Sequence, residues 1–148
     1  MPGKTPSHSK PLSHVEYAEL AAFRYALRRF LRFSEAAAER MGLSAQHYQA
    51  MLALCASAEG RLTINELAQQ LLIRHNSAVG LVDRLNKQGL ATRGPSPDDK
   101  LKVYLRLTAK GHRVLASLAE VHRDELRRIG PELKAQLQEI APTHTREE

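Results

Sequence analysis

The sequence contains little sulfur, few aromatic residues and no long apolar segment. Among its 148 residues, Cys55 is the single cysteine and aromatic residues make up 5%. One cysteine forms no intrachain disulfide, and no apolar run approaches the ~18 residues that span a bilayer. The polar N-terminal stretch also lacks the apolar core of a secretory signal. These absences predict a cytoplasmic protein in a reducing compartment, with no membrane segment.

Residue patterns typical of enzymes are also absent. The sequence has no glycine-rich phosphate loop, no serine elbow and no paired carboxylates in a pocket-forming pattern. Its 7 histidines are scattered, and no two of them are spaced as two ligands on one helix would be. We therefore expect no enzyme, no cofactor and no metal site within one chain. A metal site at an interface between two copies remains the alternative.

Positive charge is concentrated in the middle of the chain. The formal net charge is +6, and residues 61–110 contain nine of the 22 Lys and Arg but only four of the 16 Asp and Glu. A local excess of this kind indicates a polyanionic partner such as nucleic acid. A solvated basic surface without a partner is the alternative, and charge alone does not separate the two.

Residues from about 12 to 40 show the periodicity of a long helix with two apolar sides. A helix that is apolar on more than one side must be covered on more than one side. A chain of this length has little material to do so, and we expect a second copy of the protein to supply the cover. The two sides consist of Leu20, Phe23, Leu27, Phe30 and Leu31, and of Ala22, Tyr25, Ala26, Phe33 and Ala37.

Gly42 and Ser44 mark the end of this helix and the start of a second one. The second helix carries an apolar stripe at helical spacing, and its cysteine falls in that stripe. We expect a buried structural thiol rather than a reactive one, because reactivity requires an exposed thiolate. The expected stripe consists of Tyr48, Met51, Leu52 and Cys55.

Two short helices joined by a brief turn follow. Thr63 and Glu66 have the spacing of a capping box, in which each side chain binds the backbone N–H of the other residue. After a tight connection near residues 72–74, a fourth helix is predicted from about His75 to Gln88. This arrangement is typical of a helix-turn-helix. The expected inward residues are Leu67, Ala68 and Leu71 on the third helix and Ala78, Leu81, Val82 and Leu85 on the fourth.

The periodicity then changes from helical to alternating. Residues 101–107 alternate apolar with polar side chains, as a half-buried strand does. Residues 90–93 are the predicted antiparallel partner, across a turn rich in Pro, Gly and Asp. A hairpin directly after a helix-turn-helix is a wing. A fifth helix is predicted after Thr108, and a break at Gly130-Pro131 separates it from a sixth.

The polar side of the predicted fourth helix carries groups that suit the major groove of DNA. Asn76 matches adenine and Arg84 matches guanine or a phosphate. Asn76 and Ser77 also suit the capping of a helix, and for Ser77 the two interpretations carry equal weight. Asp83 is interpreted as a local partner of a basic side chain. The candidate DNA-binding residues are His75, Asn76, Ser77, Val79, Gly80, Arg84 and Lys87 on this helix and Arg93, Lys100 and Lys102 in the wing.

Over about residues 12–142, the chain resembles the MarR family of winged-helix transcriptional regulators. The resemblance implies a homodimer built from the first and last helices and a pseudo-palindromic operator of double-stranded DNA. It also implies, often, a small aromatic or phenolic effector between the dimerisation and DNA-binding lobes. The residues that carry it are the run from His75 to Leu85, Gly89-Leu90, Arg93, Pro97-Asp98-Asp99, Leu107-Thr108 and Gly111.

The predicted fold is mainly α with a small β-hairpin wing: a winged helix-turn-helix with N- and C-terminal dimerisation helices. We expect a mobile tail at residues 1–13 and a single domain at residues 14–148. Within that domain, the winged helix-turn-helix covers about residues 44–108 and the dimerisation helices about residues 14–40 and 109–142. The predicted function is a homodimeric repressor released by a small-molecule effector. A winged-helix module that binds RNA or protein without effector control is the alternative.

Two positions depart from the family pattern. Leu101 stands where the family usually has a wing arginine, and Gly80 stands where it often has a basic residue. The resemblance then implies that Lys100 and Lys102 contact phosphates, while base reading rests on Asn76, Ser77 and Arg84. The peroxide sensors of the family carry their reactive cysteine in the first helix, so Cys55 in the second helix does not indicate that subtype.

Overall fold

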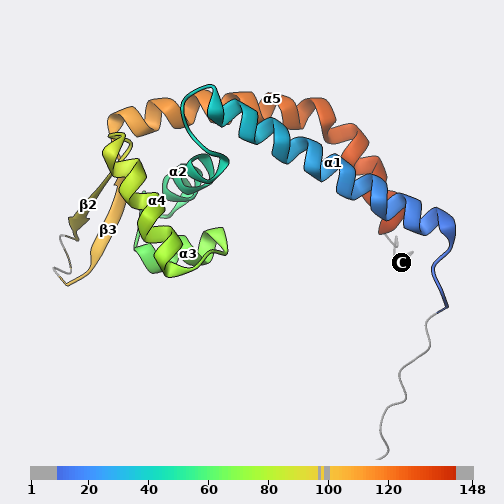
Figure 1. Cartoon of the computed structure of the whole chain (residues 1–148), viewed down its shortest axis with the longest axis horizontal. Coiled ribbons are helices and arrows are strands. Elements are labelled where there is room, and N and C mark those ends of the chain that lie inside the picture. Colours follow the sequence, from blue (N-terminus) through green and yellow to red (C-terminus); the bar gives the residue numbers. More distant parts are fainter. Residues whose placement is uncertain (1–9, 97, 99–100, 143–148) are drawn as a thin grey trace, which may run out of the picture.

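Two long helices lie side by side as an arm, and the other elements form a lobe at one end of it in a computed structural model that describes residues 10–96, 98 and 101–142 (Figure 1). The mainly helical fold with a small antiparallel sheet confirms the predicted fold class. The elements in chain order are α1 (His14–Glu39), α2 (Ala45–Ala56), β1 (Arg61–Leu62), α3 (Ile64–Leu71), α4 (His75–Lys87), β2 (Ala91–Pro95), β3 (Val103–Leu107) and α5 (Ala109–Ile140).

Side-chain caps at the helix starts explain why most helices begin where they do. Ser13, Thr63 and Thr108 each accept a hydrogen bond from the backbone N–H three residues later, at the starts of α1, α3 and α5. The capping box predicted for Thr63 and Glu66 is confirmed, with both bonds at 3.2 Å. The starts of these helices are thus set by side chains within three residues and do not depend on tertiary packing.

The sheet has three strands rather than the predicted two, in the order β1-β3-β2. The predicted hairpin of β2 and β3 is present, with Ala91 opposite Leu107 and Pro95 opposite Val103. Strand β1 pairs with the other edge of β3 and places Leu62 opposite Leu105. A strand of two residues is too short to show an alternating pattern in the sequence. Its formation depends on pairing with β3, which is distant along the chain.

The core of the lobe lies between α2, α4, α5 and the sheet. The predicted inward residues of α4 are all buried, and Leu67 and Ala68 of α3 are buried with them. The largest fully buried side chains are Met51, Leu54, Leu67, Leu81, Val82, Leu85, Leu105 and Leu118. Among the described residues, no helix is both long and apolar enough to cross a bilayer.

The expected stripe of α2 is only half right. Tyr48 and Met51 are buried, but Leu52 and Cys55 are exposed, and Leu54 takes the inward position instead. The prediction of a buried structural thiol at Cys55 is therefore wrong. The helix is apolar on most of its sides, so residue spacing alone was compatible with two different buried stripes. Packing against α5 and the sheet buries the stripe that contains Leu54.

The predicted break at Gly130-Pro131 is also wrong, because α5 continues through Pro131 to Ile140 as one helix. A proline removes one backbone hydrogen bond and clashes with the carbonyl four residues earlier, which bends a helix more readily than it ends one when both flanks are packed. Helix α5 packs along α1, so its second half remains in place beyond the proline.

The end of α4 is joined to the start of α5 by three carbonyl groups. Leu90 O accepts from Thr108 N at 3.0 Å, Gly89 O from Thr108 Oγ at 2.6 Å, and Gln88 O from Lys110 Nζ at 2.9 Å. Gly111 lies against the same turn, and a Cβ atom at this position would stand 2.1 Å from Leu90 O. The joint therefore requires glycine at position 111.

We expect Gly111→Ala to lower the free energy of unfolding by about 1–3 kcal/mol, because the added methyl group overpacks a backbone carbonyl. Gly130→Ala in the same helix is the matched control, since nothing lies within 4 Å of its Cβ position. It should raise stability by up to about 1 kcal/mol through helix propensity. Urea unfolding of both variants measures the difference, and equal stabilities would contradict the close packing.

Candidate nucleic-acid interface

Helix α4 has one buried face and one polar exposed face. Ala78, Leu81, Val82 and Leu85 face the core with at most 1% of their surface exposed. On the opposite face His75, Asn76, Ser77, Arg84 and Lys87 are exposed, while Val79 and Gly80 are half-buried at its margin. The predicted helix residues are therefore gathered on one accessible surface.

The start of α4 is oriented by α3. His75 Nδ1 lies 2.7 Å from Asn65 Oδ1, so the imidazole is tied to the preceding helix. Arg74 occupies the N-cap position and its side chain makes no capping hydrogen bond. The interpretation of Asn76 or Ser77 as the cap of this helix is therefore wrong, and both side chains lie exposed in its first turn.

An ion pair connects α4 to the wing. Asp83 on α4 pairs with Arg93 on β2, and the Arg93 side chain is 34% exposed. The interpretation of Asp83 as a local partner of a basic side chain is confirmed. Because its guanidinium is engaged, Arg93 holds the hairpin against the helix, and it lies farther from the tip than Lys102 does.

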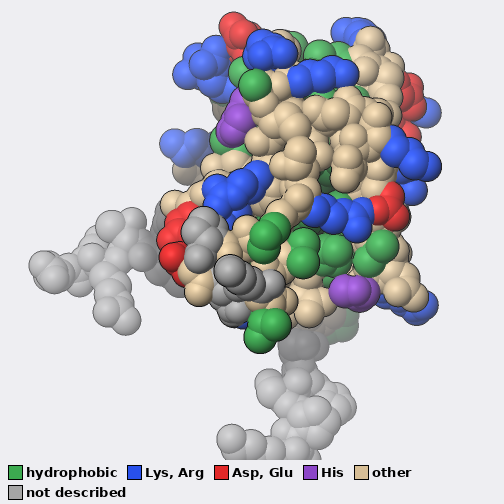
Figure 2. Space-filling view, turned by 90° about the vertical axis from the view of Figure 1, so that its left-hand side faces the viewer, with side chains coloured by type: hydrophobic (Ala, Val, Ile, Leu, Met, Phe, Trp, Pro, Cys, Tyr) green, Lys and Arg blue, Asp and Glu red, His purple; other side chains and the backbone are tan. Residues whose placement is uncertain are grey.

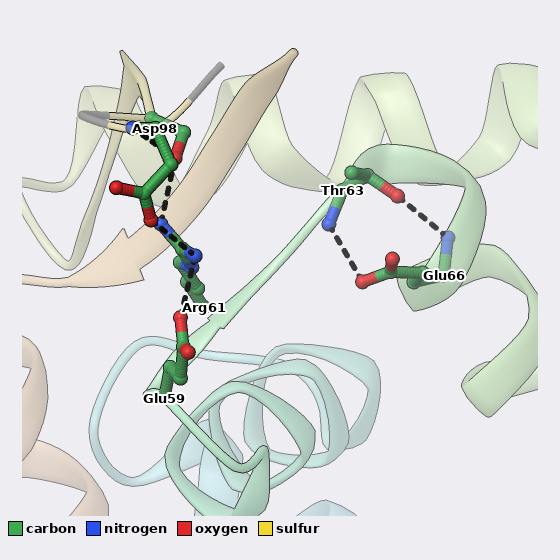
Figure 3. Close-up of polar contacts among 6 residues, drawn as sticks. Glu59, Arg61, Thr63, Glu66 and Asp98 are labelled. Carbon is green, nitrogen blue, oxygen red and sulfur yellow. Dashed lines mark hydrogen bonds and ion pairs between the residues drawn. The ribbon is translucent and has the colours of Figure 1, made fainter.

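Sequence reasoning missed the residue that anchors the other side of the wing, Arg61 on β1 (Figure 3). Its Nη1 donates to Ser96 Oγ at 2.9 Å, and its Nη2 pairs with Glu59 at 2.5 Å and with Asp98 at 3.8 Å. The guanidinium also lies 4.4 Å from the centroid of the Tyr104 ring. Its partners come from the segment before β1 and from the hairpin, and this wing anchor has no signature in the sequence.

A groove of about 460 Å³ separates the start of α3 from the wing. Asn65, Gln69 and His75 form one side of it, and Lys102 and Val103 form the other. On the face at the wing end of the molecule, Lys and Arg side chains are more widespread than Asp and Glu (Figure 2). Lys102 is exposed, whereas the predicted residue Lys100 lies outside the described part of the chain.

Helix α2 carries a buried histidine that feels the charge of Arg84 on α4. His47 on α2 accepts a hydrogen bond at Nδ1 from the backbone N–H of Ser44 at 2.9 Å, so the neutral ring carries its proton on Nε2. The Nε2 atom is buried and has no hydrogen-bond partner among the described residues. Burial, and then the positive charge of Arg84, lower the pKa of His47 below its ordinary value of 6.5.

In the part of the chain that the structure describes, no three His, Cys, Asp or Glu side chains lie close enough together to hold a metal ion. The surface made by α4 and the wing, where Asp83 and Glu66 also lie, carries basic, amide and hydroxyl groups beside a groove. Groups of this kind bind phosphates and base edges.

We expect the free energy of unfolding to fall between about pH 7 and pH 5 as a consequence of His47. Its folded-state pKa is lowered, so the unfolded chain takes up a proton near 6.5 that the folded chain still rejects, and the folded state loses stability as the pH falls. His47→Gln is the control, because glutamine also accepts at Ser44 N but does not titrate. Chemical unfolding at fixed protein concentration should show a steeper pH dependence for the parent than for the variant, and parallel curves would contradict the assignment.

Comparison with known proteins agrees with this geometry. A sequence profile described as the MarR family matches residues 41–100, which run from the end of α1 to the wing. The HTH-type transcriptional regulator FarR of Neisseria gonorrhoeae is 36% identical over 61 residues, which are 41% of this chain and 42% of that protein. The chain thus matches less than half the length of this curated relative.

Solved structures extend the likeness to the long helices. The transcriptional regulator PA4135 is 28% identical, with a TM-score of 0.63 over 88% of this chain and 93% of that one. A mutant of MepR from S. aureus, bound to an oligodeoxyribonucleotide, is 17% identical, with a TM-score of 0.64 over 84% of this chain and 94% of that one, and it shares the fold. Over residues 41–100, the segment that the profile matches, the chain is thus similar to the MarR family of transcriptional regulators.

Proposed function

We propose that the chain is a homodimeric, sequence-specific DNA-binding regulator whose α4 enters the major groove. The observation that carries the proposal is the exposed polar face of α4, which lies beside a basic wing while the opposite face of the helix is buried. An α-helix fits the major groove, where base pairs display distinct donors and acceptors. Two copies related by a two-fold axis would place two such helices one helical turn apart, about 34 Å.

Within this surface each side chain has a different task. Asn76 and Arg84 are the base readers, for adenine and for guanine, and Ser77 is an adaptable contact. Val79 meets a thymine methyl group, and Gly80 lets the helix backbone approach closely. The phosphate contacts come from His75 and Lys87 on α4 and from Arg93, Lys100 and Lys102 in the wing.

The second copy is proposed from the apolar surface of the arm. Tyr25 and Leu31 on α1 are 63% and 57% exposed, and Leu126 and Leu137 on α5 are also exposed. A groove of about 420 Å³ runs between the same two helices and contains Phe30, Phe33 and Leu133. Exposed apolar side chains on two neighbouring helices beside a groove suit a protein–protein interface, and the helices of a second copy are the cover that we propose.

Regulation by a ligand is the part of the proposal that rests on the MarR relationship. We propose a cytoplasmic repressor that blocks promoter access and leaves its operator when a small aromatic or phenolic effector binds between the arm and the lobe. Phe30, Phe33 and Tyr48 surround His122 at this junction, with ring centroids 4.0–6.2 Å from the imidazole. An aromatic ligand entering here would displace these rings and shift the lobe relative to the arm.

We expect Arg84→Ala to weaken binding of specific DNA by about 1–3 kcal/mol, because a bidentate contact to guanine is lost. The probe is a palindromic duplex selected by the parent protein from a randomised pool, titrated at several salt concentrations beside a structured RNA. Lys102→Ala is the comparison variant: it should weaken all duplexes alike and reduce the salt dependence. Unchanged affinity in Arg84→Ala removes this residue from the base readers, and tighter binding of RNA than of any duplex would contradict the function.

We expect the protein to sediment as a dimer and Leu31→Glu to dissociate it, because a carboxylate would be buried in an apolar interface without a partner. Glu35→Gln, one helical turn along α1, is the control and should leave the dimer intact. Analytical ultracentrifugation over a range of concentrations measures both. A parent protein that sediments as a monomer at every concentration would contradict the proposed dimer.

A further inference from the structure

The tip of the wing carries a large apolar side chain that the core does not use. Leu101 is 94% exposed, beside the exposed Lys102, and Val103 at the start of β3 is 50% exposed. Burying a leucine side chain is favourable because its apolar surface leaves water. The hairpin thus exposes to solvent a leucine side chain whose transfer into an apolar environment would be favourable in free energy.

The described residues on both sides of the hairpin loop are held in place by hydrogen bonds and ion pairs. Ser96 is buried, and its Oγ accepts from Arg61 Nη1 at 2.9 Å and from the backbone N–H of Asp98 at 3.2 Å. Ser96 N donates to Lys102 O at 3.3 Å, which closes the loop just after Leu101. With Asp83 pairing to Arg93 on the other strand, both sides of the wing are tied to the lobe.

We propose that Leu101 is an apolar wedge that the wing inserts into the minor groove of the bound duplex, and that Arg61 is the positioning residue that aims it. The proposal rests on the DNA-binding function proposed above and adds a mode of recognition to it. Apolar side chains, leucine among them, unstack a base step from the minor-groove side and bend the duplex. The exposed Lys102 beside it neutralises the phosphates that a bend brings together.

The wedge has a consequence for sequence preference. Pyrimidine–purine steps such as TA and CA are the most easily unstacked, whereas A-tracts are stiff and have a narrow minor groove that attracts arginine. A leucine wedge therefore selects deformable steps at a position flanking the bases that α4 reads. An arginine at the same position selects A-tracts instead.

The test is a parallel selection from a randomised duplex pool with the full-length parent and the variants Leu101→Ala, Leu101→Met and Leu101→Arg. The bend of the parent-selected duplex is then measured by energy transfer between its ends. The parent and Leu101→Met should enrich TA or CA steps in the flanks and bend the duplex by about 20° or more. Leu101→Ala should keep the central sequence but lose the flank preference and the bend, and Leu101→Arg should enrich A-tracts.

Arg61→Met separates positioning from folding. It keeps much of the aliphatic stem but removes the hydrogen bond from Arg61 to Ser96 and the ion pairs with Glu59 and Asp98, so it should reduce the bend while thermal unfolding still shows a cooperative transition. If the parent and Leu101→Ala enrich the same flanking sequences and bend the duplex by the same angle, the wedge proposal is wrong, even when both proteins still bind DNA. A parent protein that enriches no sequence at all would overturn the DNA-binding function itself, which keeps the two failures distinguishable.

Discussion

The joint between α4 and α5 is the constraint on which the rest of the structure depends. Three successive carbonyls, those of Gln88, Gly89 and Leu90, accept from Thr108 and Lys110 at the start of α5. Gly111 lets the backbone of Leu90 approach closer than any side chain would allow. The helix with the polar surface is thereby fixed to the helix that runs the length of the arm.

Ion pairs and hydrogen bonds of two arginines, rather than a large apolar core, fix the wing to the rest of the lobe. Arg61 and Arg93 lie on the two outer strands. The contacts of Arg61 with Ser96 and Asp98 tie the hairpin to β1, and the ion pair of Arg93 with Asp83 ties it to α4. Ion pairs that are part-exposed add little to stability. Their value here is geometric, because they fix the position of the hairpin, whose residues Lys102 and Val103 line the groove beside His75.

Local signals predicted the lobe well because its elements are specified by neighbouring residues. The capping box at Thr63, the inward stripe of α4 and the alternation in β3 each involve residues a few positions apart. Prediction failed where the outcome depended on distant packing. Cys55 lies on a helix that is apolar on more than one side, Pro131 lies in a helix held by α1, and β1 exists only because β3 offers it an edge.

The sequence by itself determined the helix starts, the basic middle segment, the polar face of α4 and the position of a leucine at the wing tip. Tertiary structure alone decided that Arg61 meets Ser96 across 35 residues, that Asp83 engages Arg93, and that His47 is buried within reach of the Arg84 charge. The physical reason is range. Caps and periodic stripes depend on backbone geometry within a few residues, whereas ion pairs and burial depend on which segments the folded chain brings into contact.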